Sequence, residues 1–560
     1  MFYRGIIFDL DNTIYNYDLC NNYALSVVFN YLSCNNVNNV NNVNNVYKKI
    51  SKDLKKDLIN TASSHNKSIC LKHMLEKLNL GLNDFSAIHN LYWKSFYEKL
   101  ECNPGIKEFI LWNKQRNVQI GILTDYETEY QIIKLEKLGL LEFVDCIITS
   151  EEIGKEKPST QMFHAILSKM KMSADDVIMI GDNFEKDIVG ANDLNIFAYW
   201  FSPNERIKSE KYVSFDSFEM LLRDLKVICD DLIELKTISK YCGERFDLVQ
   251  AGGGNASVKT CNNWLAIKAS GFNMTNMDTK NGYVIMDNKK IIQDINDGNV
   301  KDVLNYNVIG NKRGSIETFM HSILKKYTVH LHPIQLNRIL VCKHARAAIN
   351  EIWPAALIID YLTPGIKVCD EILKCRNNQD NKNVIFLLNH GIIITSDDKK
   401  EIYDLIEDVL SKFEKFQNLD MTRYKMTNNI SKLVNSTFNV DNVSYLSEDT
   451  IINNYLREKP SVFSENVTFP DALIYCGAKC LFGLENIHHY KEMYGESPKI
   501  IIENNSVYIN ANSLSKCKEI EDVLKSQLII IDSDFEKNYL SLDEICFLNN
   551  WDAEKYRKML

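Results

Sequence analysis

The 560-residue sequence lacks long apolar runs, paired-cysteine motifs, internal repeats and any excess of basic residues. No run approaches the roughly 18 apolar residues that a membrane-spanning helix needs, so we expect no such helix. The 15 cysteines are scattered without a CxxC pair, which favours reduced thiols over a disulfide framework. Because 65 basic residues stand against 74 acidic ones, the net charge of −9 predicts no broad surface for nucleic acid or anionic lipid.

The first residues and the overall composition are those of an ordinary globular protein. A charged motif begins by residue 9, so no apolar region of signal-peptide length precedes it, and we expect a cytoplasmic protein. Apolar residues make up 45% of the chain and charged residues 25%. Since 560 residues exceed one ordinary core, length alone predicts about three to four domains.

The spacing of apolar residues predicts an α/β protein in which strands and helices alternate along most of the chain. The expected boundaries are 1–205 with a helical stretch at about 16–100, a charged linker at 206–221, a second α/β region at 222–435, and a smaller α/β segment at 443–560. The low-complexity stretch NNVNNVNNVNNV (35–46) is expected to be a polar insertion, although its valines could lie on a helix.

Polar side chains follow several predicted strands of the first region at the point where each strand ends. IIFDLDNT places Asp9 and Asp11 after a buried run, where carboxylates are costly unless they bind a cation or take part in chemistry. Further polar groups are Thr124 in VQIGILTD, Lys157 in GKEKPS, and Asp182 and Asp187 in VIMIGDNFEKD. Open parallel sheets bind ligands at this edge, and these groups suit phosphoryl transfer through an aspartyl phosphate with Mg²⁺.

These motifs resemble, in order, the four motifs of the haloacid dehalogenase superfamily. The resemblance implies a Rossmannoid parallel-sheet phosphatase with Asp9 as nucleophile and Asp11 as general acid/base, and with Thr124 and Lys157 as phosphate ligands. It also implies a Mg²⁺ site on the acidic residues Asp9, Asp11, Asp182 and Asp187. Dehalogenases of this superfamily lack the second aspartate, so Asp11 favours a phosphatase. The helical stretch at about 16–100 looks like the superfamily's α-helical cap.

A second group of polar residues follows in the region 222–435. VHLHPIQLN places His330 and His332 two apart in a strand-like run, where side chains at i and i+2 project from the same face. NVIFLLNHG ends another apolar run with His390, the third imidazole that a catalytic zinc site needs. The alternative is that these histidines are packed core residues. Glu317, in GSIETFMH, belongs to another element and could reach the site as a base.

Small and polar residues near these histidines suit phosphate oxygens. The Gly-rich turn VQAGGGNASVKT leads into Asn255 and Ser257, and NWLAIKASG ends in Ser270 and Gly271. Together with SIET…H, VHLHP and NHG, these stretches resemble, in order, the class II aldolase/adducin family. The resemblance implies Zn²⁺ on His330, His332 and His390, with Glu317 as the acid/base. It implies substrate-phosphate binding by Asn255, Ser257, Ser270, Gly271 and Ser315.

Members of this family differ in reaction. The 4-epimerases carry Asp at the position of Glu317, whereas aldolases and some dehydratases and decarboxylases carry Glu. The short segment from Glu317 to His330 looks like the rhamnulose-1-phosphate aldolase branch, and so do VTFPDALIYCG and NNWDAEKYRKML near the end of the chain. Adducin-like members have lost metal ligands that are all present here. Active sites of class II aldolases usually lie between subunits, so the resemblance implies a homo-oligomer, expected to be a tetramer.

The sequence therefore predicts a bifunctional carbohydrate-phosphate enzyme. It would combine a Mg²⁺-dependent phosphatase with a zinc-dependent class II aldolase that acts on a phosphorylated ketose. One alternative is that the zinc domain is a sugar-phosphate dehydratase of the methionine-salvage type, a decarboxylase or an epimerase. Another is that it is a non-catalytic, adducin-like assembly module. The identity and stereochemistry of the sugar cannot be read from these motifs.

Overall fold

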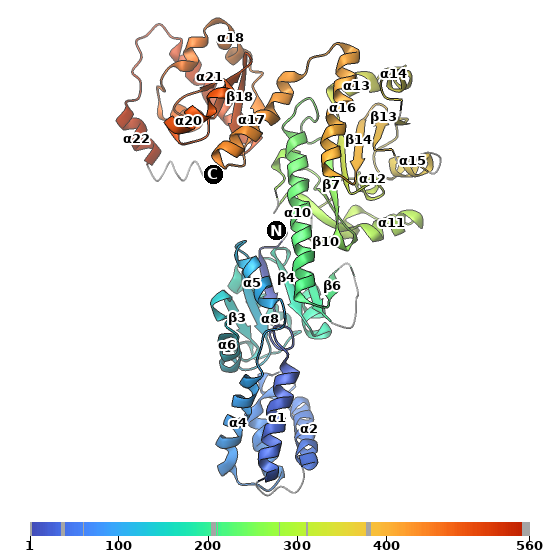
Figure 1. Ribbon diagram of the computed structural model, residues 1–560, viewed down its shortest axis with the longest axis vertical. Helices are drawn as coiled ribbons and strands as arrows, with labels where there is room; N and C mark the ends of the chain where they lie inside the picture. The colour runs from blue at the N-terminus through green and yellow to red at the C-terminus, as the bar shows by residue number, and fades with distance from the viewer. Residues whose placement is uncertain are drawn as a thin grey trace. The chain divides into compact units, whose positions relative to one another are not determined.

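The computed structural model describes residues 3–34, 40–59, 61–202, 209, 211–278, 281–309, 312–354, 356–376 and 382–550 (Figure 1). Contacts between residues divide the chain into two units. The first is Met1–Asp230 with Ile285–Asp287 and Leu304–Asn311, and the second contains the rest of the chain. The predicted α/β class is confirmed, because sheets and helices alternate in the described parts of both units. No helix in the described ranges is long and apolar enough to cross a membrane.

Six parallel strands form the sheet of the first unit, in the order β3-β2-β1-β4-β5-β6. Their bounds are β1 Gly5–Phe8, β2 Gln119–Thr124, β3 Cys146–Thr149, β4 Val177–Gly181, β5 Phe197–Phe201 and β6 Tyr212–Phe215. All residues of β1 and β4 are buried, as expected for parallel strands covered on both faces. The strand order reverses at β1, and ligands of such sheets bind at this switch point, beyond the carboxyl ends of the strands.

Helices follow the strands of this sheet. They are α5 Ile106–Lys114, α6 Thr128–Lys137, α7 Ser150–Ile153, α8 Thr160–Met170 and α9 Gly190–Asn192, with a π-helical turn at Phe184–Val189. Helix α8 packs on β2 and β3. Its buried residues Met162, Phe163 and Ile166 join the apolar core beneath the sheet. The strand ends are therefore held by a close-packed layer.

The helical stretch expected at about 16–100 contains α1 Tyr17–Cys34, α2 Val40–Asp57, α3 Lys67–Lys77 and α4 Phe85–Glu98. Helix α1 packs along α4, and α2 contacts α1 and α3, so these helices form one bundle (Figure 1). Residues 40–46 of the Asn/Val-rich stretch belong to α2, where Val43 is fully buried. The valines of this part lie on a helix, and residues 35–39 lie outside the described residues.

The linker expected at 206–221 needs a correction. Tyr212–Phe215 is strand β6, which pairs with β5 at the edge of the first sheet, and helix α10 begins at Phe218. Val213 and Phe215 are buried, and the ring of Phe215 lies 5.2 Å from that of Phe218. The apolar alternation of this four-residue strand is short, and charged neighbours conceal it in the sequence. Residues 203–208 and 210 lie outside the described residues.

An eight-stranded sheet, in the order β10-β9-β8-β7-β11-β14-β13-β12, carries the second group of polar residues. Its strands are β7 Asn255–Thr260, β8 Trp264–Lys268, β9 Tyr283–Asp287, β10 Asn307–Ile309, β11 Tyr327–Leu331, β12 Leu357–Ile359, β13 Val384–Leu387 and β14 Gly391–Ser396. The helices are α10 Phe218–Gly243, α11 Asn288–Asn296, α12 Thr318–Ser322, α13 Ile334–Leu340, α14 Ala345–Ile352, α15 Ile366–Arg376 and α16 Lys399–Gln417. Strand β11 pairs antiparallel with β7 and with β14, which brings distant segments together.

A smaller sheet, in the order β15-β18-β17-β16, forms the last part of the second unit. Its strands are β15 Val443–Leu446, β16 Leu481–Phe482, β17 Ile500–Glu503 and β18 Ser506–Ala511. The helices here are α17 Thr422–Phe438, α18 Thr450–Glu458, α19 Pro470–Cys476, α20 Ile487–Tyr494, α21 Leu514–Ile531 and α22 Leu542–Asn550. The segment expected at 443–560 is thus α/β as far as Asn550, and residues 551–560 lie outside the described residues.

Candidate active sites

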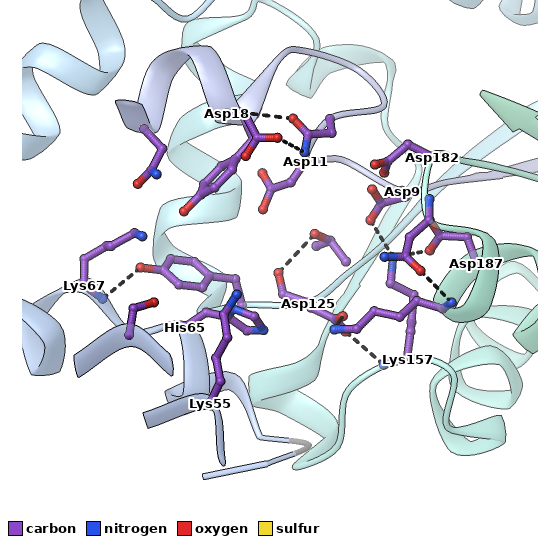
Figure 2. A pocket seen from close by; sticks show the side chains of 18 of the residues that line it. Asp9, Asp11, Asp18, Lys55, His65, Lys67, Asp125, Lys157, Asp182 and Asp187 are labelled. Atoms are coloured by element: carbon purple, nitrogen blue, oxygen red, sulfur yellow. Dashed lines mark hydrogen bonds and ion pairs between the residues drawn. The ribbon is translucent and has the colours of Figure 1, made fainter. Parts of the chain in front are cut away.

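The first candidate site lies at the carboxyl ends of the parallel strands, where the sequence places its conspicuous carboxylates. Strand β1 pairs in parallel with both β2 and β4, so Asp9, Thr124 and Asp182 come to one edge of the sheet. The backbone N–H of Asp9 donates to the carbonyl of Ile180 (2.9 Å), which holds this residue beside the end of β4. Figure 2 shows Asp9 and Asp182 directed toward a shared cavity.

Asp9, Asp182 and Asp187 bring carboxylate oxygens within 4.8 Å of one another. The ammonium of Lys157 lies between two of them, at 2.5 Å from Asp9 Oδ1 and 2.6 Å from Asp187 Oδ1. Gly181 makes the close approach of Asp187 possible, because a Cβ atom on it would lie 2.5 Å from Asp187 Cβ. One ammonium does not balance three carboxylates. The remaining negative charge and the oxygen donors fit a Mg²⁺ ion.

The pKa shifts of these carboxyl groups also fit a bound cation. Burial raises the pKa of Asp9 well above its usual range, the Lys157 ammonium lowers it, and the carboxylates of Asp187 and Asp182 raise it again. Burial and the neighbouring Asp187 raise the pKa of Asp182 to about 6. Carboxylates this close repel one another, so they retain protons that neutralise part of their charge. A divalent cation would take over that role and release the protons.

The side chain of Asp11 lies apart from this cluster and has partners of its own. Its Oδ1 accepts from Lys134 Nζ (2.8 Å) and from the hydroxyl of Tyr15, and its Oδ2 accepts from Gln131 Nε2 (3.2 Å). Burial alone would raise the pKa of Asp11, but the Lys134 ammonium and the hydrogen bonds lower it below the usual range. The expected contribution of the Asp11 carboxylate to the Mg²⁺ site has no support in this arrangement.

A cavity of about 380 Å³ opens beside these groups and is lined from both the sheet and the helical bundle. Asp9, Asp11, Thr124 and Lys157 all line it, so the structure brings the four expected chemical groups together. The hydroxyl of Thr124 accepts from Gln131 Nε2 (2.6 Å). Helices of the bundle add side chains that the sequence did not single out: Tyr17, Asn21, Tyr47, Ser51, Lys55 and Lys67.

The second candidate site lies where β11, β14 and the turn after β13 meet. His330 Nε2 is 3.0 Å from His332 Nε2 and 3.3 Å from His390 Nε2. Three nitrogens of a tetrahedral zinc site with bonds of about 2.0–2.1 Å stand roughly 3.3 Å apart, so this spacing fits a zinc ion. Nδ1 of His330 lies 3.1 Å from the carbonyl oxygen of Ile392. A proton on Nδ1 donates to that carbonyl and leaves Nε2 free for a metal.

The electrostatics of His330 and His332 also fit a metal. Burial and the neighbouring rings of His332 and His390 hold the pKa of His330 well below its usual range. Burial and His390 lower the pKa of His332 as well. Neutral imidazoles are the form that binds a metal ion. Backbone packing keeps them in place, because a Cβ atom on Gly391 would lie 2.8 Å from His332 Cδ2 and closer still to the carbonyl of Leu331.

Glu317 closes the open side of the three imidazoles. Its Oε1 lies 3.4 Å from Nε2 of both His330 and His390, and its side chain is buried. The amide of Asn255 donates to Oε2 of Glu317 and, at 3.4 Å, to the hydroxyl of Ser315. The backbone N–H of Glu317 also donates to that hydroxyl (3.2 Å). Asn255 therefore holds the carboxylate of Glu317, and Ser315 holds its backbone.

The expected phosphate-binding residues fall into two groups. Ser270 and Gly271 are exposed, and the antiparallel bridge between Ala269 and Gly314 brings them beside Ser315. Ser257 is different, because its buried hydroxyl lies 2.7 Å from Nδ1 of His321. His321 is itself fully buried, so Ser257 is covered, and a direct contact with phosphate has no support for this residue.

Several residues that shape the first site escaped the sequence analysis. Gln131 and Lys134 hold Asp11, and Thr13 donates from its hydroxyl toward Asp9 (3.3 Å) and Asp182 (3.2 Å). The signal for the first two was a pair of polar residues at i, i+3 on the helix EYQIIKLEKLG. It is weak, because such pairs are common on exposed helix faces. Only the fold shows that this pair faces Asp11.

Two family models match the chain. Residues 6–201 match a model described as haloacid dehalogenase-like hydrolase, and residues 235–414 match one described as class II aldolase and adducin N-terminal domain. Among solved structures, a class II aldolase domain from Thermoplasma acidophilum is 24% identical, with a TM-score of 0.31 over 39% of this chain and 99% of that one. The HAD-hydrolase YfnB from Bacillus subtilis is 22% identical, with a TM-score of 0.34 over 40% of this chain and 100% of that one.

Two named relatives of the chain are phosphatases. A ribulose-1,5-bisphosphate 5-phosphatase from Halopiger xanaduensis is 33% identical over 205 residues, which are 36% of this chain and 85% of the relative. A glyceraldehyde 3-phosphate phosphatase from Methanocaldococcus jannaschii is 27% identical over 219 residues, 39% of this chain and 90% of the relative. By its N-terminal domain the chain belongs to the haloacid dehalogenase-like hydrolases, and it joins to that phosphatase domain a class II aldolase and adducin N-terminal domain.

Proposed function

We propose that the protein is a bifunctional carbohydrate-phosphate enzyme, with a Mg²⁺-dependent phosphatase and a zinc-dependent aldolase that acts on a phosphorylated ketose. The observation that carries the second activity is the convergence of three imidazoles on Glu317, which lies 3.4 Å from two of them. An assembly module would have no use for a buried carboxylate beside three converging histidines. Two of the chain's relatives are named for phosphorylated sugars, which supports the same substrate class here.

In the phosphatase, an Asp9 carboxylate oxygen attacks the phosphorus atom. The bond between phosphorus and the sugar oxygen breaks, and that oxygen takes a proton from Asp11. Water then attacks the phosphorus on Asp9 and gives a proton to Asp11, which frees Asp9 and inorganic phosphate. Lys157 and Thr124 hold phosphoryl oxygens during both steps. A bound Mg²⁺ ion would supply positive charge to the phosphoryl group at Asp9, Asp182 and Asp187.

The surroundings of Asp11 suit its two roles. Before substrate enters, the Lys134 ammonium keeps Asp11 ionised, which is the form that accepts a proton from water in the second step. A phosphate dianion in the cavity adds negative charge next to Asp11 and raises its pKa. The protonated form needed for the leaving oxygen is therefore favoured by the substrate itself.

In the aldolase, Glu317 moves the proton at the carbon atom that acts as the nucleophile. Asn255 holds its carboxylate and Ser315 holds its backbone, so little motion is needed for the transfer. Ser270, Gly271 and Ser315 offer polar groups at one edge of the site for the substrate phosphate. A bound zinc ion would polarise the ketose carbonyl at His330, His332 and His390.

A coupled assay for dihydroxyacetone phosphate on a panel of ketose 1-phosphates tests the proposal. The assay uses Asp9→Asn protein, so that the phosphatase cannot consume the substrates, and Asp9→Asn/Glu317→Gln protein as the matched control. Release of dihydroxyacetone phosphate that disappears in the control supports the aldolase. Release of inorganic phosphate by the wild type, and not by Asp9→Asn, supports the phosphatase.

Other outcomes would replace one half of the proposal. A diketone product without dihydroxyacetone phosphate would make the second domain a dehydratase. Purified protein without bound zinc and without any product would favour an assembly module.

We also propose that the protein is a homo-tetramer in the cytoplasm. Light scattering of the purified protein tests the oligomeric state.

A further inference from the structure

Lys67 differs from Lys157 and Lys186, two other lysines that line the cavity of the phosphatase domain. It is the first residue of helix α3, is only 9% exposed, and lies on the side of the cavity opposite Asp9 (Figure 2). Lys157 and Lys186 each pair with two carboxylates. Within the described part of the chain, no carboxylate forms an ion pair with Lys67.

The surroundings of Lys67 are aromatic and hydroxylic instead. Its ammonium donates to the hydroxyl of Tyr47 (3.1 Å) and lies 5.6–5.8 Å from the ring centres of Tyr17, Tyr47 and Tyr92. The hydroxyl of Tyr126 accepts from the backbone N–H of Lys67 (3.2 Å). Aromatic faces compensate only part of the cost of removing an ammonium from water. The position is thus complementary to an anion.

We propose that Lys67 binds a second anionic group of the phosphatase substrate, a phosphate or a carboxylate. This group would lie at the end remote from the phosphoryl group that Asp9 attacks, and the inference rests on the proposed phosphatase function. The same cavity of about 380 Å³ is lined by Asp9 and by Lys67, so one small molecule can reach both. Tyr17 and Tyr47 line the cavity next to Lys67 and bring hydroxyl groups to the same end. The domain therefore selects doubly anionic substrates over neutral-ended monoesters.

Matched pairs of phosphate monoesters test this inference. 3-Phosphoglycerate and glycerol 3-phosphate differ in a carboxylate, and ribulose 1,5-bisphosphate and ribulose 5-phosphate differ in a phosphate, so the two pairs separate the two anions. The wild type should show a kcat/KM at least about tenfold higher for the doubly anionic member of one pair, as expected for one lost charged contact. Lys67→Met should remove most of that preference, and Lys67→Arg should retain much of it.

Lys72→Met is the control, because Lys72 lies on the same helix with a side chain that is 47% exposed and pairs with Glu76 at the surface. It should leave both rates and the preference unchanged. Equal rates for both members of each pair in the wild type would overturn the inference, and so would an equal loss on all four compounds in Lys67→Met. If that variant does not fold, Lys67→Gln, which can still donate to Tyr47, takes its place. No phosphate release from any compound by the wild type would refute the proposed phosphatase as well.

Discussion

His330 and His332 bring their Nε2 atoms to 3.0 Å from each other on one side of the sheet formed by β7, β11 and β14. The alternation of a strand accounts for their shared direction, since they are two residues apart. The carbonyl of Ile392, on the neighbouring strand, accounts for the ring orientation of His330. The third imidazole and the carboxylate come from segments that only the folded sheet places nearby.

The metal and the proton-transfer group should be separable by substitution. We expect His390→Gln to lose zinc, because it removes one of three ligands, and Glu317→Gln to keep zinc but lose carbon–carbon cleavage. Substitution of a residue that merely orients a ligand typically costs about 10–100-fold in metal affinity, so loss of a ligand should cost more. Metal analysis of dialysed protein measures the first effect. Equal zinc loss in both variants would instead make Glu317 a ligand.

A methyl group on Gly391 should disturb the zinc site by steric contact, although none of the three histidines is substituted. In Gly391→Ala the new Cβ would lie 2.8 Å from Cδ2 of His332, so the ring or the hairpin must shift. We expect weaker zinc binding by about tenfold or more, measured by competition with a chelator. Gly252→Ala is the control, because its nearest neighbour, Asn273 Oδ1, would be 3.9 Å away. Unchanged zinc affinity in Gly391→Ala would show that the hairpin adapts.

Lys157 should act as the counter-charge of the phosphatase cluster. Lys157→Met leaves the buried carboxylates of Asp9 and Asp187 without their ammonium, which should lower the free energy of unfolding by about 3 kcal/mol. We expect added Mg²⁺ to raise the melting temperature more in this variant than in the wild type, because the cation replaces the lost charge. Thermal unfolding with and without Mg²⁺ measures this. Lys169→Met, at an exposed ion pair, should behave like the wild type. An equal Mg²⁺ response in the wild type and both variants would refute this role.

Stability should depend on pH through Glu244, which directly follows helix α10. Burial raises its pKa to about 8, and hydrogen bonds from Ser431 and Asn428 oppose this only in part. A carboxyl group with a raised folded-state pKa contributes its full stability below its unfolded value near 4.5, and loses it as the pH rises toward 8.

We therefore expect Glu244→Gln to match the wild type near the unfolded pKa and to exceed it by about 1–3 kcal/mol at alkaline pH. Urea unfolding of both proteins at acidic and alkaline pH measures the difference. Glu492→Gln, at an exposed position, should show no such change between the two pH values. A Glu244→Gln variant that is no more stable than the wild type at alkaline pH would contradict the expected effect of burial.

The polar groups at strand ends could be predicted from the sequence, because an apolar strand and the polar residue that follows it are neighbours along the chain. Asp9, Thr124 and Asp182 end or follow apolar runs, and parallel pairing necessarily collects such ends at one edge. The same holds for the HxH pair at the end of β11, where His332 directly follows the strand. Strand β6 was missed for the opposite reason, since four residues among charged neighbours carry too little periodicity.

The tertiary structure decided which groups each candidate side chain contacts. Ser257 was read as a phosphate ligand from its Gly-rich turn, but His321 covers it. Asp11 was grouped with the acidic residues, but Lys134 and Gln131 draw its carboxylate away from them. Both outcomes depend on helices that pack over a strand from elsewhere in the chain, and residue spacing contains no record of that packing.

The sequence by itself determined the α/β class, the order of the two catalytic-type domains and most of the groups available for chemistry. Each of these follows from local periodicity and from short motifs. The tertiary structure alone decided which groups stand within bonding distance, from the three imidazoles around Glu317 to the ammonium of Lys67 among tyrosines. These distances arise from contacts between residues far apart in the chain, because burial and charge are properties of the packed molecule and not of a segment.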